Sequence, residues 1–474
     1  MIAESTQDGR NLLEVRSPYS GEIVGIVPRA GRAEVDRTLD DAERGAERMA
    51  ALPAHERAAI LHRAADAVQA DEQRLAATIT AEQGKHQADS RAEASRIAGI
   101  LRLCAEEALR LSGELLPMDA APQSVGRLGF VRPEPVGVVA AIAPFNYPAI
   151  LVLHKIGPAL AAGNAVVLKP ASTTPLTSLF LVAALVKAGL PEDALQCLVG
   201  SGAEIGERLV ADPRVRRITF TGSYEVGAAI ARAAGPKRLA AFELGSNAAM
   251  VILDDADLDR AATSAALSGY TNSGQNCVST QRIIVDEKVR DELVERLLEH
   301  VDALVLGDPA DAATTLAPVI EEREAERVLT WVREAASAGA DVLRGGERVG
   351  TLVEPLVVLE PPRESRIWRE ELFGPGVVIH AVRGDDEALA AANDTRFGLA
   401  ASVMTRNTDR ALRFASGLRT GMVNINPPRG NTWRSDFMPW GGVGDSGFGR
   451  EGVKYAVREL SEHKLVVIHP GDSE

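Results

Sequence analysis

The amino-acid sequence predicts an α/β protein built on two doubly wound, largely parallel sheets. At 474 residues the chain is longer than one hydrophobic core normally serves, so two or more domains are expected. Residues 30–112 read as amphipathic helices, and from Val136 onward short apolar runs alternate with helical segments. Such alternation is typical of parallel sheets that carry helices on both faces.

The helical region is predicted from its periodicity. Residues 30–112 are rich in Ala, Glu and Arg, and apolar residues recur at helical spacing, as in residues 58–61 followed by Ala64, Ala65 and Val68. No internal repeat, low-complexity tract or long linker stands out along the sequence.

Four short apolar runs are the predicted strands of a first sheet: residues 136–143, 165–168, 195–199 and 217–220. They end at Pro144, at Lys169-Pro170, at Gly200 and at Thr221-Gly222-Ser223, respectively. Ligands of such sheets bind at the carboxyl ends of the strands, so these turns are the predicted ligand-binding edge.

A second α/β stretch is predicted from about Ser246. Its candidate strands are residues 248–253, 282–285 and 377–381, and the apolar tail 465–468 is a further strand that needs a partner. Glu243 and Cys277 lie between the two sheets, where active-site clefts usually form.

Composition excludes several classes of protein. The chain is 46% hydrophobic and 25% charged, with a formal net charge of −14, which argues against binding to nucleic acid or to an anionic membrane surface. No secretory signal is visible, and the longest apolar stretch, residues 136–143, is too short to span a bilayer. The three cysteines, Cys104, Cys197 and Cys277, form neither a disulfide framework nor a metal-ligand pattern, so a reducing cytoplasm is expected.

Three residues are candidates for chemistry. Cys277 lies in a small, polar segment, TNSGQNCVST, where a thiol is reachable and can ionise for nucleophilic attack; the alternative is a buried, inert cysteine. Glu243 ends an apolar run, where poor solvation raises a carboxyl pKa toward that of a general base; the alternative is a capping carboxylate. Asn146, between Pro144 and Pro148, is a rigidly held amide suited to an oxyanion, or a simple turn asparagine.

Taken together, eight segments resemble the aldehyde dehydrogenase superfamily in their order along the chain. They are AIAPFNYP, GNAVVLKPAS, ITFTGS, FELGS, GQNC, EELFGP, FGLAASV and GGVGDSGFGRE. The resemblance runs from about residue 14 to residue 468. It implies an NAD(P)-binding, Rossmann-like domain (residues 1–112 and 136–245), a catalytic domain (246–455) and a β oligomerisation arm (113–135 and 456–474). The expected assembly is a homodimer or homotetramer.

The resemblance also implies roles for individual residues. Cys277 resembles the nucleophile that forms a thioester, and Glu243 the base that activates water to hydrolyse it. The Asn146 side chain and the backbone N–H of Cys277 resemble the oxyanion hole, and Glu451 a carboxylate of a proton relay. The residues expected to bind NAD or NADP are Ala143, Pro144, Phe145, Lys169, Ser172, Gly202, Gly206, Thr221, Gly222, Ser223, Val226, Leu244, Gly245, Glu371 and Phe373. The chain has no GxGxxG fingerprint in this region, so the cofactor prediction depends on the resemblance. No metal is expected.

Two departures from the family pattern bear on specificity. Ser172 stands where many relatives have a glutamate that repels a 2′-phosphate, which favours acceptance of NADP; the alternative is a neutral change that leaves NAD preferred. Arg96 and Arg434 are expected to line the substrate tunnel with Tyr147 and Trp440, and two guanidinium groups suit an anionic aldehyde. The alternative is that each arginine pairs with a carboxylate such as Asp436 or Glu93.

The local pattern is similar to that of enzymes acting on lactaldehyde, glyceraldehyde 3-phosphate, and sulfo- or phosphono-aldehydes, and a succinate-semialdehyde-type substrate fits it too. Two other functions remain open at this point. A CoA-acylating semialdehyde dehydrogenase resembles this family but tends to lack the base at Glu243. A catalytically silent relative with a structural role would not need Cys277, Glu243 and Asn146 together.

Overall fold

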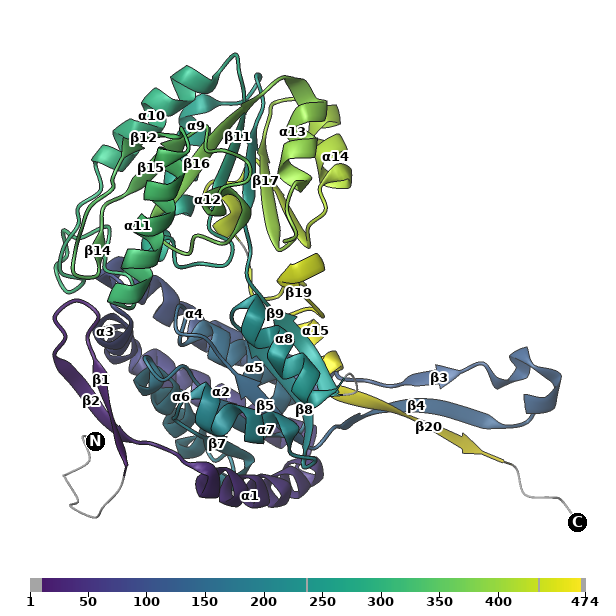
Figure 1. Ribbon diagram of the computed structural model, residues 1–474. Helices are drawn as coiled ribbons and strands as arrows, with labels where there is room; N and C mark the ends of the chain where they lie inside the picture. Colours follow the sequence, from purple (N-terminus) through teal and green to yellow (C-terminus); the bar gives the residue numbers. More distant parts are fainter. Residues whose placement is uncertain (1–10, 236–237, 434, 470–474) are drawn as a thin grey trace, which may run out of the picture.

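A computed structural model describes residues 11–235, 238–433 and 435–469, and it shows two lobes, each with its own sheet (Figure 1). The sheet of the lower lobe has six strands in the order β19-β9-β8-β5-β6-β7. All neighbours pair in parallel except β19, which is antiparallel to β9. The strands are β5 (Val138–Ile142), β6 (Ala165–Lys169), β7 (Leu195–Cys197), β8 (Val215–Thr221), β9 (Leu239–Glu243) and β19 (Gly447–Phe448).

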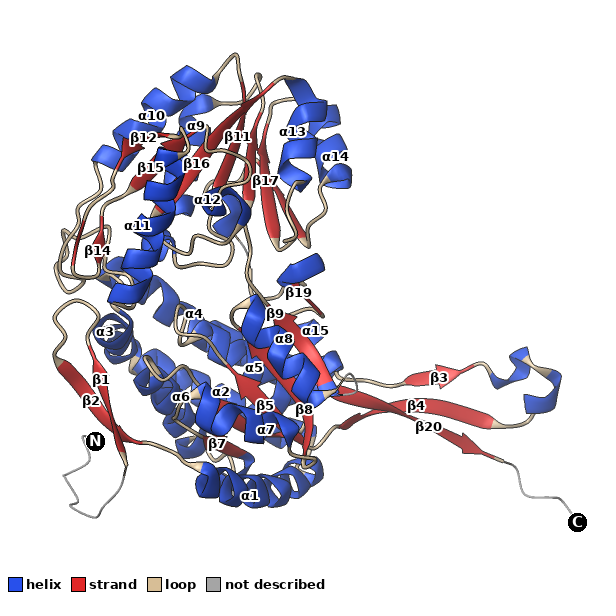
Figure 2. Cartoon of the chain, viewed as in Figure 1, coloured by secondary structure: helices blue, strands red, loops and turns tan. Residues whose placement is uncertain are grey.

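Helices cover both faces of this sheet (Figure 2). They are α1 (Arg32–Ala51), α2 (Ala54–Ala70), α3 (Glu72–Gln83), α4 (Gln87–Arg110), α5 (Ile150–Ala161), α6 (Pro175–Lys187), α7 (Glu207–Ala211), α8 (Tyr224–Ala234) and α15 (Val453–Glu459). Alternate residues of β5 enter different cores: Val139 packs with α2, α4 and α5, and Ala140 packs with α1 and α7. The sheet is therefore buried on both faces, as its continuous apolar strands predict.

The upper lobe holds a seven-stranded sheet in the order β12-β15-β16-β11-β10-β17-β18. Its strands are β10 (Ala249–Ile252), β11 (Arg282–Asp286), β12 (Asp341–Arg344), β15 (Leu356–Leu359), β16 (Gly376–Val382), β17 (Ala400–Met404) and β18 (Met422–Ile425). Its helices are α9 (Leu258–Tyr270), α10 (Arg290–Asp302), α11 (Glu322–Ser337), α12 (Arg366–Arg369), α13 (Gly384–Asn393) and α14 (Thr408–Gly417).

The predicted α/β class, the early helices and the predicted strands are confirmed, and several elements were not predicted. They are the hairpins β1–β2 (Leu12–Arg16, Ile23–Pro28) and β13–β14 (Arg348–Val349, Leu352–Val353), and the sheet strands β12, β15, β17, β18 and β19. The strand β17 reads AASVM, and its alanines favour a helix by propensity. Pairing with β10 and β18 on its two sides outweighs that local preference.

A three-stranded sheet projects from the lower lobe as an arm (Figure 1). It consists of β3 (Glu114–Leu116), β4 (Leu128–Pro135) and β20 (Ser461–Ile468). The tail strand predicted at residues 465–468 finds its partner here, because β20 pairs antiparallel with β4 along its whole length. The arm exposes Leu115, Leu128, Leu465 and Ile468, which is more apolar surface than a free edge normally presents. None of the helices described is long and apolar enough to cross a membrane.

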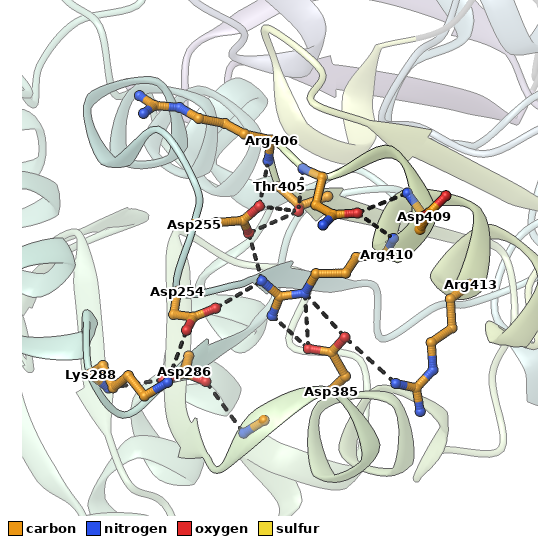
Figure 3. Close-up of polar contacts among 12 residues, drawn as sticks. Asp254, Asp255, Asp286, Lys288, Asp385, Thr405, Arg406, Asp409, Arg410 and Arg413 are labelled. Carbon is orange, nitrogen blue, oxygen red and sulfur yellow. Dashed lines mark hydrogen bonds and ion pairs between the residues drawn. The ribbon is translucent and has the colours of Figure 1, made fainter.

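A network of charges closes the carboxyl edge of the upper sheet (Figure 3). Arg410 on α14 donates to Asp385 through two nitrogens, to Asp254 at 2.8 Å and to Asp255 at 2.9 Å. Asp254 also accepts from Lys288 at 2.9 Å, and hydrogen bonds from Lys288 and Arg410 hold its pKa below the ordinary value. One guanidinium thus joins α14, α13 and the end of β10.

We predict that Arg410→Met lowers the stability of the protein by about 2 kcal/mol, because three carboxylates lose their common partner. Urea unfolding followed by circular dichroism measures the change. Arg413→Met is the matched control on the same helix. Arg413 pairs with Asp386 and lies 3.6 Å from Asp385, with its own side chain 46% exposed, and such surface pairs contribute about 0–1 kcal/mol. Equal losses in the two variants would contradict a central role for Arg410.

Candidate active site

A cavity of about 550 Å³ lies between the two lobes. The lower lobe contributes residues that follow the carboxyl ends of β5, β6, β8 and β9: Pro144, Phe145, Asn146, Ala171, Gly222, Ser223, Leu244 and Gly245. The upper lobe contributes Cys277, Glu371 and Phe373, among others. Because parallel strands end at one edge, four connections of the lower sheet reach the same cavity.

Cys277 stands on the wall of this cavity, half-buried, in the connection from α9 to β11. The connection starts with a 3-10 turn in which Asn272 (φ 52°), Ser273 (φ 54°) and Gly274 (φ 70°) are left-handed. A Cβ on Gly274 would lie 1.8 Å from the carbonyl oxygen of Gly374, so only glycine fits there. The turn is therefore fixed against the segment 371–375, and the thiol position is fixed with it.

Asn146 reaches the same wall from the loop between β5 and α5. Its side chain is buried, and Nδ2 donates to the backbone oxygen of Gln275 at 3.0 Å. An amide nitrogen carries two hydrogens, so the second N–H remains available for a ligand beside Cys277. The structure brings the predicted nucleophile and the predicted oxyanion donor together from different lobes.

Glu243 is the last residue of β9 and is 1% exposed. Its backbone oxygen accepts from Gly222 at 3.1 Å, and a Cβ on Gly441 would lie 2.9 Å from its Oε1. Gly441 therefore leaves room for the carboxylate, which a side chain at that position would displace. Glu243 lies behind the cavity wall, since it does not line the cavity itself.

Glu451 lies deeper in the lower lobe. Its Oε1 is 2.5 Å from Nζ of Lys155 and 3.5 Å from Oγ1 of Thr221, and all three side chains are buried. Lys155 was not predicted from the sequence, because a lysine in an apolar helix usually extends its amine to solvent. Here the backbone of Glu451 forms an isolated antiparallel β-bridge with Trp440, which holds the carboxylate in the interior beside Lys155.

The rest of the cavity suits a dinucleotide. Helix α8 begins at its edge, and the Ser223 side chain caps the helix by accepting from the Val226 N–H at 3.4 Å. A helix start presents N–H groups and a positive dipole to a phosphate. The predicted cofactor residues that line the cavity are Thr221, Gly222, Ser223, Val226, Leu244, Gly245, Glu371, Phe373, Pro144 and Phe145.

Two contacts hold the upper-lobe wall of the cavity, with Glu371 and Phe373, in place. Phe373 has a left-handed backbone (φ 46°), and its ring meets Phe145 edge-on at 5.9 Å. Glu371 accepts from the Ser246 N–H at 2.9 Å, and burial raises the pKa of Glu371 to about 7. Above that pH the carboxylate is ionised and accepts hydrogen bonds from hydroxyl groups.

Five of the predicted cofactor residues lie outside the cavity wall: Ala143, Lys169, Ser172, Gly202 and Gly206. The Ser172 hydroxyl donates to the Gly200 carbonyl oxygen at 2.8 Å, which ties the end of β6 to the end of β7. The Lys169 Nζ donates to the carbonyl oxygen of Pro170 at 3.2 Å, and burial lowers its pKa. These residues continue the carboxyl edge beyond Ala171, which does line the cavity.

Several lining residues were missed from the sequence: Tyr224, Glu225, Glu324, Arg327, Trp331, Arg396 and Phe397. They come from α8, α11 and the turn before β17, segments far apart in the chain. No spacing rule joins them, so only the folded lobes reveal that they face one cavity. Arg396 packs over the ring of Phe397 at 4.2 Å and pairs with Glu370 and Asp445.

Two of the predicted substrate residues, Arg96 and Trp440, lie in a second group near α5. Arg96 on α4 and His154 on α5 both contact Asp436, and His154 meets Trp440 edge-on at 5.4 Å. Burial opposes ionisation of Asp436, but the hydrogen bonds from His154 and Arg96 outweigh it and hold its pKa well below the ordinary range. Arg96 therefore has a carboxylate partner, the alternative that the sequence left open, whereas Arg434 lies outside the described residues.

Comparison with known proteins gives consistent matches. The model of the aldehyde dehydrogenase family matches residues 4–466. A 3-sulfolactaldehyde dehydrogenase of Priestia aryabhattai is 39% identical, with 96% of this chain and 95% of the relative covered.

Solved structures agree with this match. Aldehyde dehydrogenase 21 from Physcomitrella patens, in complex with the reaction product succinate, superposes with a TM-score of 0.95 at 35% identity, over 99% of this chain and 97% of that one. The glyceraldehyde-3-phosphate dehydrogenase of Methanocaldococcus jannaschii complexed with NADP gives 0.92 at 35% identity, over 97% and 99%.

We predict that iodoacetamide alkylates Cys277 in the native protein and leaves the other two cysteines unmodified. Cys104 is fully buried, which raises its pKa, and burial raises the pKa of Cys197 to about 12; protonated thiols react slowly. Peptide mass spectrometry after limited labelling measures this. Labelling of Cys197 at the rate of Cys277 would show that the cavity gives Cys277 no advantage.

Proposed function

Since the chain belongs to the aldehyde dehydrogenase family and is an NAD(P)-dependent enzyme, we propose that it oxidises a small anionic or hydroxylated aldehyde to the acid through a thioester on Cys277. The observation that carries this proposal is the meeting of the Cys277 thiol and the Asn146 amide on one cavity wall. The lower lobe is proposed to bind the cofactor, and the upper lobe to carry the nucleophile.

The proposed reaction begins with addition of the Cys277 thiolate to the aldehyde carbon. The carbonyl oxygen becomes an oxyanion, which accepts from the second N–H of Asn146 and from the backbone N–H of Cys277. A donor in this position is worth roughly 3 kcal/mol of barrier. Because Gln275 already fixes Nδ2 at 3.0 Å, the amide needs little reorganisation when the charge develops.

The cavity residues fit a dinucleotide. We propose that Ser223 and the start of α8 hold the pyrophosphate and that Glu371 and Phe373 hold the nicotinamide riboside. When bound, the nicotinamide accepts the hydride that leaves the former aldehyde carbon. Ser172 leaves the edge beyond Ala171 without a carboxylate at that position, so we propose that NADP is accepted as well as NAD.

Hydrolysis of the thioester needs a base, and Glu243 is proposed for this step. Its carboxylate is buried at the end of β9, and a poorly solvated carboxylate is more basic than one in water. Glu451 and Lys155 are proposed to pass the released proton away from the cavity, since Glu451 also reaches Thr221 on the strand beside β9. Acyl transfer to CoA would not require this base.

The proposed substrate class comes from the relatives and from the charged group at α5. Relatives act, by name, on 3-sulfolactaldehyde and on glutarate semialdehyde, which carry an anionic group. In this chain Arg96 is paired with Asp436, so we propose that Arg434 supplies the positive charge for the substrate anion. Tyr147 and Trp440 are proposed to form the apolar walls.

The arm is proposed to join copies of this chain. The strands β3 and β20 are the two edges of its sheet, and exposed apolar residues on them favour burial against a second strand. A homodimer or homotetramer would satisfy both edges.

We predict that Glu243→Gln still gives a stoichiometric burst of NAD(P)H, followed by turnover slowed by roughly 10²–10⁴-fold. Rapid-mixing absorbance separates the two phases. Glu82→Gln is the control: Glu82 is another fully buried carboxylate, whose pKa burial raises to about 7, and its neutralisation should leave the ratio of burst to turnover unchanged. Absence of a burst would contradict the assignment of Glu243 to hydrolysis alone. Acceleration of the wild type by CoA would favour the acylating alternative.

We predict that the wild type prefers succinate semialdehyde or lactaldehyde to hexanal and benzaldehyde, with either cofactor. Arg434→Leu should raise KM for the anionic aldehyde by roughly 10–100-fold, as expected for a lost charge-assisted contact. The same substitution should leave KM for propanal unchanged. Steady-state kinetics across this panel tests the proposal. Equal effects on all the aldehydes would mean that Arg434 does not contact the anionic group.

A further inference from the structure

We propose that Lys85 is a positioning residue for the oxyanion site. Its buried ammonium, paired with Glu93, sets Asn146 against the loop that carries Cys277. Lys85 does not line the cavity, so it acts through Asn146 and not on the substrate. The inference rests on the proposed function, because it assigns a role in stabilising the oxyanion at Cys277.

The contacts of Lys85 leave its ammonium little freedom. The residue follows the left-handed Gly84 (φ 80°) that ends α3, and its side chain is 0% exposed. Nζ donates to Glu93 Oε2 at 2.6 Å and to the backbone oxygen of Asn146 at 2.9 Å. It also lies 3.7 Å from the centroid of the Tyr147 ring, where a cation is attracted to the π face. Each of the three ammonium hydrogens therefore has an acceptor at hand.

Glu93 holds the other end of the same loop. Its Oε1 accepts from the N–H of Ala149 at 2.9 Å and of Ile150 at 3.1 Å, where α5 begins. A carboxylate at a helix start is stabilised by the dipole and by the free N–H groups. The Lys85–Glu93 pair thus fixes residues 146–150 at both ends, which determines where the Asn146 side chain points.

The turn that carries Cys277 is fixed to the same part of the lower lobe. Asp89, on the first turn of α4, accepts from the backbone N–H of Asn272 at 2.9 Å. The Asn272 side chain donates to the Asn146 oxygen at 3.0 Å, so that oxygen accepts from Lys85 and Asn272 together. Asn276, next to Cys277, donates to the Tyr147 hydroxyl at 3.2 Å. Segment 85–93 therefore aligns a donor from one lobe with a nucleophile from the other.

The test must separate positioning from the cost of an unpaired buried charge. Lys85→Met alone would leave Glu93 charged and unpaired, which is strongly destabilising. The double variant Lys85→Met/Glu93→Gln removes both charges, and the glutamine oxygen still serves the start of α5. Lys85→Gln/Glu93→Gln is a second neutral pair that keeps hydrogen-bonding groups, should the first fail to fold.

The rate of the NAD(P)H burst is the readout, with succinate semialdehyde as substrate. We expect the double variant to lower it by roughly 10–100-fold, since a misplaced group of this kind can cost that much. Alkylation of Cys277 by iodoacetamide needs no oxyanion donor, so its rate should be unchanged, as should KM for the cofactor. In an Asn146→Ala background the double variant should cause no further loss, because Lys85 acts through Asn146.

Three results would overturn the inference: an unchanged burst rate, a parallel loss of alkylation and cofactor affinity, or additive effects with Asn146→Ala. Different results would contradict the proposed function itself. If the wild type gave no burst, or if Asn146→Ala had no effect on it, the oxyanion assignment itself would be wrong. If the burst rate were normal in the wild type, lowered in Asn146→Ala and unchanged in the double variant, only the role of Lys85 would be rejected.

Discussion

In a parallel sheet, the connections that follow the strands all leave from one edge, the carboxyl edge. The cavity forms because the carboxyl edge of the lower sheet faces the opposite, amino edge of the upper sheet. The lower lobe turns its carboxyl edge toward the cavity, so the residues after β5, β6, β8 and β9 meet there without being close in sequence. The upper lobe faces the cavity with the segment before β11, which carries Cys277, while its own carboxyl edge lies elsewhere. That far edge carries Asp254, Asp255 and Asp385, whose charges are paired with Arg410 and, for Asp254, also with Lys288 (Figure 3). The upper sheet thus carries its charge network at one edge and the candidate nucleophile at the other.

Buried charge also organises the site itself. Lys85 with Glu93 and Lys155 with Glu451 are fully buried pairs, and each connects a helix of the lower lobe to a residue expected to act in the reaction. A buried ion pair adds little to stability compared with apolar packing, but it is specific about distance and direction. Residues that must be placed within a few tenths of an ångström gain more from such a partner than from the hydrophobic contacts around them.

How far the sequence predicts this molecule depends on whether a feature is local. Apolar runs ending in Gly or Pro locate β5, β6 and β8, and the resemblance singles out Cys277, Glu243 and Asn146. Local patterns failed for β17, because its alanines favour a helix whereas pairing with β10 and β18 makes it a strand. They also failed for Lys85, Lys155 and Arg327, since a lone lysine or arginine reads as a solvated side chain. The partnership of Arg96 with Asp436, 340 positions apart, was foreseen only as an alternative, because long-range pairing leaves no trace in neighbouring residues.

The antiparallel pairing of β19 with β9 has a consequence for how the chain is made. Gly447 pairs with Glu243, and 447 − 243 = 204 positions separate them, so the lower sheet stays incomplete until the ribosome has produced the entire upper lobe. At about 5–20 residues per second, that interval lasts roughly 10–40 s. Throughout it the edge of β9 is open on the nascent chain, and β4 waits even longer for β20. An open strand edge is a template for wrong pairing, so the growing polypeptide is exposed to such pairing while it is still on the ribosome.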